Sequence, residues 1–225
     1  MGANVTFPSN AHRCEGYLAP PIEGRGSAVV VIQEWWGLVP HIADVVDRFA
    51  ASGFLALAPD LYHGKKTTSP NEAKKLRMEL EAERAVDEIL AAGEYLLQRP
   101  ECSSATFGVV GFCMGGALAQ AAATRGGKVG AAASFYGTFK NVKIDWDALR
   151  APLLLIYGAN DVSVPASQGV ALEKELRAKG KNVDTVVYEG ANHAFFNDSR
   201  PEVFNQDAAD DAWIRTVELF RKHLR

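Results

Sequence analysis

The chain has 225 residues, of which 48% are hydrophobic and 23% are charged, and its formal net charge at pH 7 is −3. This length favours one large buried core, and we expect a single domain over residues 1–225. The composition leaves no room for a long disordered tail, and the charged residues form no basic cluster. Binding to nucleic acid or to a membrane surface is therefore not predicted.

The sequence also argues against export and against a bound metal. No apolar run is long enough for a signal peptide or a transmembrane helix. Cys14, Cys102 and Cys113 are odd in number and lack the CxxC spacing, so neither a disulfide framework nor a zinc site is expected. We predict a cytoplasmic protein that needs no metal or other cofactor.

Short apolar runs alternate with helical periodicity along most of the chain. The opening, to about residue 26, is rich in glycine and proline, and we expect only a short strand around 17–19 there. Most later strands lack polar alternation, which is typical of parallel strands covered on both faces. Ser69 and Glu72 form a capping-box pattern with proline at the first helical position. The expected strands are 28–32, 55–58, 106–110, 131–136, 153–157 and 185–188, and the expected helices 41–52, 70–83, 86–97, 114–124, 165–178 and 206–224, with a connector at 140–150.

This alternation predicts a three-layer α/β/α sandwich with a mostly parallel central sheet. In open sheets of this kind, ligands bind at the carboxyl ends of the strands. Residues that directly follow the predicted strands are therefore the first candidates for a functional site.

The segment 109–116, Val-Val-Gly-Phe-Cys-Met-Gly-Gly, has the pattern of a nucleophile elbow with cysteine in place of serine. A sharp turn from strand to helix brings the residues two places before and after its apex close together. Gly111 and Gly115 remove the side chains that would collide there. The turn also places Cys113 at a helix N-terminus, where free amides favour a thiolate and a developing oxyanion. The alternative is a small buried cysteine in an ordinary turn.

Asp161 and His193 follow later predicted strands, so Cys113, Asp161 and His193 come in the order nucleophile, acid, histidine. This is the chain order of the triad in α/β-hydrolases. Taken singly, Asp161 would suit a turn or helix cap, and His193 would suit a hydrogen-bonded loop histidine. Together, the three residues indicate nucleophilic catalysis.

Five segments of this chain resemble the dienelactone hydrolase family of the α/β-hydrolase superfamily. The match runs from about Tyr17 to the C-terminus at consistent spacing. The resemblance implies an α/β-hydrolase fold with Cys113 as nucleophile, Asp161 as acid and His193 as base. It also implies that Glu34 contacts the resting thiol and helps to deprotonate it when substrate arrives. The segments are 33–37 (QEWWG), 59–62 (PDLY), 111–116 (GFCMGG), 157–161 (YGAND) and 190–195 (GANHAF).

These roles imply hydrolysis of a small ester or lactone through a thioacyl-enzyme. The backbone amides of Met114 and Trp35 would form the oxyanion hole, as is usual for the fold. Aromatic residues near strand ends suggest a pocket for an apolar or aromatic ester, although some of them are expected in the core. The expected pocket residues are Trp36, Tyr62, Tyr136, Phe195 and Asn197.

The chain departs from the family at the residues that hold the substrate carboxylate. One family arginine lies four residues after the catalytic histidine, and here that position is Asn197. The second arginine has no clear match between Glu72 and Glu83. Arg200 is a replacement candidate, although it also has the character of a solvated surface residue. Ester or lactone hydrolysis is therefore better supported than activity on dienelactone itself.

Three other functions remain open at this stage. The first is a broad-specificity carboxylesterase that acts on neutral aryl esters and not on dienelactone. The second is a non-catalytic binding protein that has kept the hydrolase fold. The third is a redox-sensing thiol at Cys113, which would not need Asp161. The expected partner is a small ester or lactone, and the expected assembly is a monomer or a small homo-oligomer.

Overall fold

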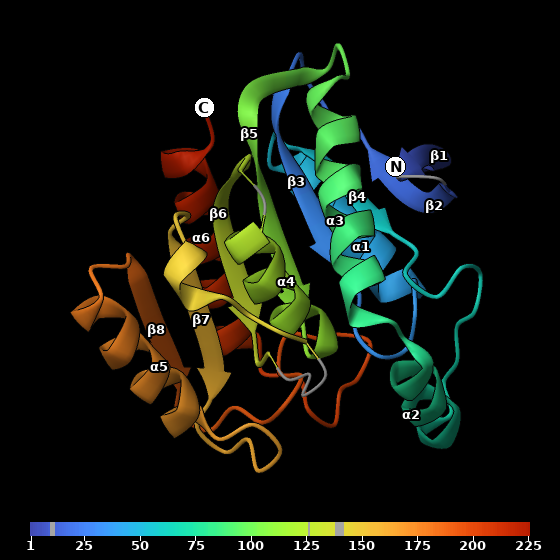
Figure 1. Ribbon diagram of the computed structural model, residues 1–225. Coiled ribbons are helices and arrows are strands. Elements are labelled where there is room, and N and C mark those ends of the chain that lie inside the picture. The colour runs from blue at the N-terminus through green and yellow to red at the C-terminus, as the bar shows by residue number, and fades with distance from the viewer. Residues whose placement is uncertain (10–11, 126, 138–141) are drawn as a thin grey trace.

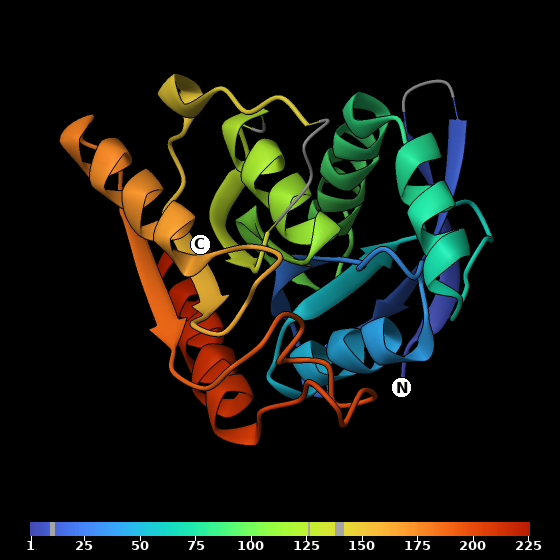
Figure 2. The same cartoon turned by 90° about the horizontal axis from the view of Figure 1, so that it is seen from below.

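A computed structural model describes residues 1–9, 12–125, 127–137 and 142–225. Within these residues the strands form one eight-stranded sheet in the order β1-β2-β4-β3-β5-β6-β7-β8, with helices on both faces (Figures 1 and 2). The architecture is the predicted three-layer α/β sandwich. The strands are β1 (Ala3–Ser9), β2 (His12–Ala19), β3 (Gly26–Ile32), β4 (Leu55–Pro59), β5 (Cys102–Phe112), β6 (Val129–Phe135), β7 (Leu153–Gly158) and β8 (Val183–Tyr188).

Two groups of helices cover the sheet (Figure 2). Helices α1 and α6 share one hydrophobic cluster, and α3 and α4 contribute to the cluster on the other face, on which α5 also packs. None of the helices in the described parts of the chain is both long and apolar enough to cross a membrane. The helices are α1 (Pro40–Ala51), α2 (Pro70–Glu79), α3 (Ala82–Leu97), α4 (Met114–Arg125), α5 (Ala166–Ala178) and α6 (Gln206–His223), with one 3-10 turn, η1 (Trp146–Ala148).

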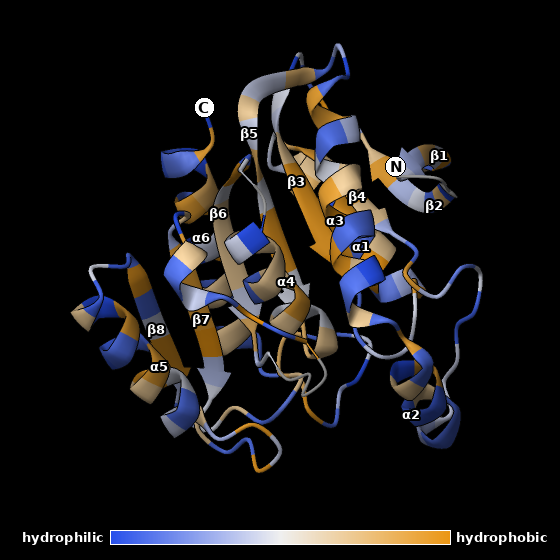
Figure 3. Cartoon of the chain, in the orientation of Figure 1, coloured by the Kyte–Doolittle hydropathy of each residue, from blue (hydrophilic) through white to orange (hydrophobic). Residues whose placement is uncertain are grey.

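Strand β3 shows why the continuous apolar runs form the middle of the sheet. Val29 and Val31 face the cluster of α1 and α6, whereas Val30 and Ile32 face the cluster of α3 and α4. All four side chains are fully buried. A strand covered on both faces has no place for polar alternation, and Figure 3 shows β3 coloured as one of the hydrophobic strands.

The N-terminal region holds more structure than the sequence predicts. Instead of one short strand, β1 and β2 pair antiparallel along their whole length, and residues 16–19 of β2 pair antiparallel with 56–59 of β4. The burial of β1 alternates only near its end, because β1 is the edge strand and faces solvent. The hairpin is held in the sheet by the pairing of β2 with β4, a strand 40 residues away in the sequence. A local apolar pattern gives no sign of such a long-range contact.

Helix α2 begins at Pro70 as predicted but ends at Glu79, earlier than expected. The side chain of Ser69 makes no capping hydrogen bond, so the predicted capping box does not form. The carbonyl of Ser69 accepts the first backbone hydrogen bond of the helix, from the amide of Ala73. Of the predicted connector 140–150, residues 140–141 lie outside the described part of the chain, and the remainder contains η1.

The turn between β5 and α4 has the geometry of the predicted elbow. Cys113 has φ 54°, a left-handed conformation that is strained for a residue with a side chain. A Cβ on Gly111 would overlap the carbonyl oxygen of Gly115. A Cβ on Gly115 would lie 2.5 Å from the carbonyl oxygen of Gln33. The glycines therefore allow the helix to approach the sheet closely enough to force Cys113 into this conformation.

Replacing Gly111 with alanine is expected to destabilise the fold by about 3 kcal/mol, because the new methyl group meets backbone that cannot move without shifting the helix. Urea unfolding followed by circular dichroism measures this change. Gly127 is the matched control, since a Cβ there meets nothing within 4 Å. Gly127→Ala should change the free energy of unfolding by no more than about 0.5 kcal/mol. Equal stability of the two variants would contradict the steric account of the elbow.

Candidate functional site

The candidate site lies along the carboxyl edge of the parallel strands. Each of the six strands β3 to β8 is followed within a few residues by a side chain that the sequence singled out. Because these ends meet at one edge, residues up to 159 positions apart in the sequence come together there. The residues, in strand order along the chain, are Glu34, Tyr62, Cys113, Tyr136, Asp161 and His193.

Asp161 and His193 form a direct hydrogen bond. Their Oδ2 and Nδ1 atoms are 2.6 Å apart. The other carboxylate oxygen, Oδ1, accepts hydrogen bonds from the amides of Ser163 and Val164, each at 2.8 Å. Burial would raise the pKa of Asp161, but the hydrogen bonds from His193 and these amides outweigh it and lower the pKa. Asp161 is therefore an ionised, oriented partner for the imidazole.

The imidazole of His193 lies between this carboxylate and Cys113. Burial acts to lower its pKa, but hydrogen bonding to Asp161 and interactions with Cys113 outweigh burial and raise the pKa to about 10. The hydrogen bond to Asp161 therefore favours the protonated imidazole. Its ring also packs on Tyr136, with the ring centroids 4.9 Å apart, which fixes its plane.

Cys113 is 7% exposed at the start of α4. Its amide donates to the carbonyl of Phe135 at 3.0 Å, which ties the elbow to the neighbouring strand β6. Within the described residues, the amides of Met114 and Trp35 donate to no other group of the protein. Both amides are therefore free to bind an oxyanion.

Glu34 is buried, and Asn197 is its hydrogen-bond partner. The Nδ2 atom of Asn197 donates to Oε2 of Glu34 at 2.8 Å. The Oδ1 atom of Asn197 accepts from the amide and the hydroxyl of Ser199. Asn197 is only 2% exposed, and it holds Glu34 in place while lining a cavity beside Trp36. Burial raises the pKa of Glu34 above its ordinary value, against the lowering effects of His41, Asn197, His193 and Arg200.

The expected pocket aromatics divide into buried residues and cavity residues. Phe195 is fully buried and packs edge-on against Tyr136 and Tyr188, so it belongs to the core. Tyr136 is also fully buried, and its φ of 40° turns it toward His193 just after β6. Its pKa is raised by burial and by the nearby Glu34 and Cys113. Tyr136 therefore forms part of the wall behind the reacting groups.

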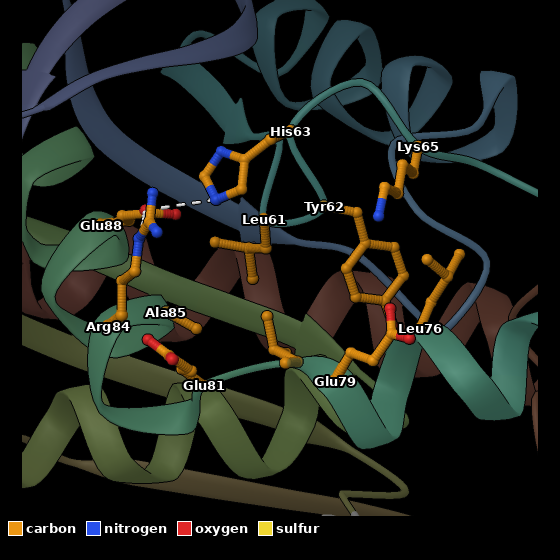
Figure 4. A pocket seen from close by; sticks show the side chains of 11 residues that line it. Leu61, Tyr62, His63, Lys65, Leu76, Glu79, Glu81, Arg84, Ala85 and Glu88 are labelled. Carbon is orange, nitrogen blue, oxygen red and sulfur yellow. Dashed lines mark hydrogen bonds and ion pairs between the residues drawn. The ribbon is translucent and has the colours of Figure 1, made fainter.

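Tyr62 and Trp36 line two different cavities. Tyr62 lies in a cavity of about 230 Å³ between the loop after β4 and helices α2 and α3 (Figure 4). Its hydroxyl donates to Sδ of Met114 at 3.4 Å, which places it beside the elbow. Trp36 shares a cavity of about 520 Å³ with His41, Asn197 and Arg200. Neither cavity is lined by Cys113 or His193.

Two arginines lie over the tryptophans that follow β3. The guanidinium of Arg77 is 6.0 Å from the ring of Trp35, and that of Arg200 is 5.8 Å from the ring of Trp36. The sequence pointed to Arg200 but not to Arg77. Helical spacing is the signal that could have identified Arg77. Residues four apart lie on the same face of a helix, and Arg77 comes four residues after Ala73, which is buried on the inner face of α2. Arg77 is half-buried, and its guanidinium lies against Trp35.

Comparisons with known proteins show the family to which the chain belongs. The profile of the dienelactone hydrolase family matches residues 14–224. The chain belongs to the dienelactone hydrolase family. It is 37% identical to "Protein usf" of Aquifex pyrophilus, with 100% of each chain covered. It is 33% identical, again over 100% of both chains, to a protein of Aquifex aeolicus (strain VF5) named "Putative carboxymethylenebutenolidase".

A solved structure supports the same assignment. The "Putative Dienelactone Hydrolase" of Klebsiella pneumoniae subsp. pneumoniae MGH 78578 superposes with a TM-score of 0.89 at 27% identity, over 99% of both chains. Family membership identifies the chain as a carboxylic ester hydrolase. The family resemblance read from the five sequence segments is thus confirmed.

The raised pKa of His193 gives a direct test of its contact with Cys113. An NMR titration of the wild-type imidazole should give a pKa of about 10. Cys113→Ala should lower that pKa, because the sulfur atom that interacts with the imidazolium is gone. His223 is the internal control: burial and its basic neighbours lower its pKa, and the substitution should not affect it. An unchanged His193 would show that Cys113 does not interact with it.

Proposed function

We propose that this protein hydrolyses small carboxylic esters or lactones through a thioacyl-enzyme formed on Cys113. The observation that carries the proposal is the 2.6 Å contact between His193 and Asp161 at the strand edge where the strained Cys113 emerges. A histidine oriented by a carboxylate beside a nucleophile at a helix N-terminus is the arrangement that acyl transfer needs.

In the first half of the reaction, the sulfur of Cys113 attacks the carbonyl carbon of the ester. The resulting oxyanion binds the free amides of Met114 and Trp35. One such donor contributes roughly 3 kcal/mol to transition-state stabilisation in hydrolases of this type. The proton on His193 then moves to the leaving alcohol oxygen as the carbon–oxygen bond breaks. The products are the alcohol, or the opened end of a lactone, and a thioester on Cys113.

In the second half, water cleaves the thioester. The sulfur is now bonded to the acyl group, so it no longer supports the charge on His193, and the pKa of His193 falls. The neutral imidazole accepts a proton from water, and the hydroxide adds to the acyl carbon. Collapse of this intermediate releases the acid and restores the sulfur beside a protonated His193.

The substrate proposal follows from the two arginines. Arg77 and Arg200 lie over Trp35 and Trp36, on the segment that provides an oxyanion amide. A carboxylate on the substrate would find guanidinium groups there, although neither occupies the position of Asn197. We therefore favour an ester or lactone that carries an acidic group, as in the reaction named for the Aquifex aeolicus relative. A neutral aryl ester is the second candidate, supported by the aromatic surface of Trp36 and Tyr62.

The triad proposal is tested by turnover of 4-nitrophenyl acetate and of a dienelactone. Cys113→Ala and His193→Ala should abolish turnover of both, and Asp161→Asn should lower kcat by about 10⁴-fold, as in serine-protease triads. Cys102→Ala is the matched control, because this second buried thiol lies at the far end of β5. Retained hydrolysis by Cys113→Ala would refute the nucleophile and leave a binding function. Peroxide reactivity that persists without Asp161 would favour a redox role instead.

The role of Arg77 is tested by comparing substrates with and without a carboxylate. Arg77→Gln should raise KM for the carboxylate-bearing lactone about tenfold or more, since a charge-assisted hydrogen bond is lost. KM for 4-nitrophenyl acetate should stay the same. Lys74→Gln removes an exposed charge from the same helix and should affect neither substrate. Equal loss on both substrates would mean that Arg77 supports Trp35 and does not bind the carboxylate.

A further inference from the structure

Helix α2 is attached to the rest of the molecule by few contacts. Of its ten residues only Ala73 and Leu76 are buried, whereas eight of the sixteen residues of α3 are buried. The ion pair of Lys75 with Glu72 lies within α2, and among the described residues no side-chain hydrogen bond or ion pair joins α2 to another element. Figure 1 shows α2 at the periphery of the molecule, beyond the end of α3. A helix with so little buried surface opens at a low cost in free energy.

Two cavities border α2 and reduce its packing further. Leu76 and Glu79, in the second half of the helix, line the cavity of about 230 Å³ that also holds Tyr62 (Figure 4). Pro70, the first residue of the helix, lines the cavity of about 520 Å³ beside Trp36. Side chains that face a cavity lose the contacts that close packing would give them. The helix can therefore shift without breaking a close-packed interface.

The residues at the two ends of α2 are suited to act as hinges. Ser69 and Leu80 flank the helix in extended conformations, and the side chain of Ser69 makes no capping hydrogen bond. Leu80 and the extended Glu81 separate α2 from α3, so the two helices do not form one rod. Before the helix, the chain is fixed where the amide of Thr67 donates to the carbonyl of Trp36 at 3.0 Å. Rotation about these end residues would move α2 as a unit.

Arg77 is the residue of α2 that reaches the candidate site. Its guanidinium lies 6.0 Å from the ring of Trp35, whose amide is an oxyanion donor in the proposed reaction. This contact with an aromatic ring leaves the N–H donors of the guanidinium free, and among the described residues Arg77 has no carboxylate partner. Arg200, in contrast, is already paired with Glu202. A carboxylate on the substrate would give Arg77 the acceptor that it lacks.

We propose that α2 is a cap that opens and closes at the site, and that the carboxylate of the substrate holds it closed by binding Arg77. This proposal rests on the proposed function for its substrate class, an ester or lactone with an acidic group. Such a substrate favours the closed state because it contacts Arg77 on the cap and the oxyanion amides at the strand edge at the same time. A neutral ester lacks the first contact and leaves α2 free to open. The cap thus supplies the recognition of a carboxylate that the neutral side chain of Asn197 does not.

The opening of α2 is measured by amide hydrogen exchange, followed by mass spectrometry of peptides. In the free protein, the amides of α2 should exchange at least about tenfold faster than those of α3. Cys113→Ala, which should not turn over substrate, is then saturated with a dienelactone that carries a carboxylate. Exchange in α2 should slow at least about tenfold, while α6 should not change. The methyl ester of the same lactone is the matched ligand without the charge, and it should leave the exchange of α2 as in the free protein.

Two further variants, made in the same background, assign the effect to one side chain. Arg77→Gln should abolish the slowing by the dienelactone, and Lys74→Gln should retain it. Exchange of α2 as slow as that of α3 in the free protein would overturn the proposal. Equal slowing by the methyl ester would also overturn it, as would unchanged exchange with the dienelactone bound, as judged by isothermal titration calorimetry.

Failure of the cap and failure of the proposed hydrolysis give different results. A dienelactone that does not bind would overturn the cap, whereas turnover of 4-nitrophenyl acetate by the wild type would still support the hydrolysis. Absence of turnover of both substrates by the wild type would refute the hydrolysis. The exchange of α2 with bound dienelactone would then still decide whether Arg77 closes the cap.

Discussion

The close approach of helix α4 to the end of strand β5 is the constraint on which the site depends. Gly111 and Gly115 touch backbone where any side chain would collide. This contact holds Cys113 at φ 54°, directly after the carboxyl end of β5. It also brings the amide of Met114 to the same place. The strain of one residue is therefore maintained by packing across the whole sheet, which two large hydrophobic clusters stabilise.

Around this turn, the charges are arranged in two pairs with different environments. His193 and Asp161 share a strong hydrogen bond, and the proton of His193 is further held by Cys113. Glu34 is buried against a neutral amide, and its ionisation depends on charges in the surrounding shell. In the proposed mechanism, the first pair supplies a proton during acylation and accepts one during deacylation.

Sequence reasoning predicted most of the parallel sheet, because buried strands and amphipathic helices have local signals. It missed the length of the β1–β2 hairpin, whose pairing with β4 is a long-range contact on an exposed edge. It also expected a capping bond at Ser69 that does not form. Around the candidate site, the order of Cys113, Asp161 and His193 was visible because each follows a recognisable strand. Arg77 was missed, because its proximity to Trp35 depends on how α2 packs.

The sequence by itself determined the fold class, the elbow glycines and the candidate triad, because these depend on local sterics and on the periodicity of buried residues. Only the tertiary structure decided which side chains meet. It placed Asn197 against Glu34, buried Phe195 in the core and brought Asp198 to His41. These contacts join residues up to 163 positions apart, through loops whose course follows from packing. No local pattern encodes such distances, so these contacts became visible only in three dimensions.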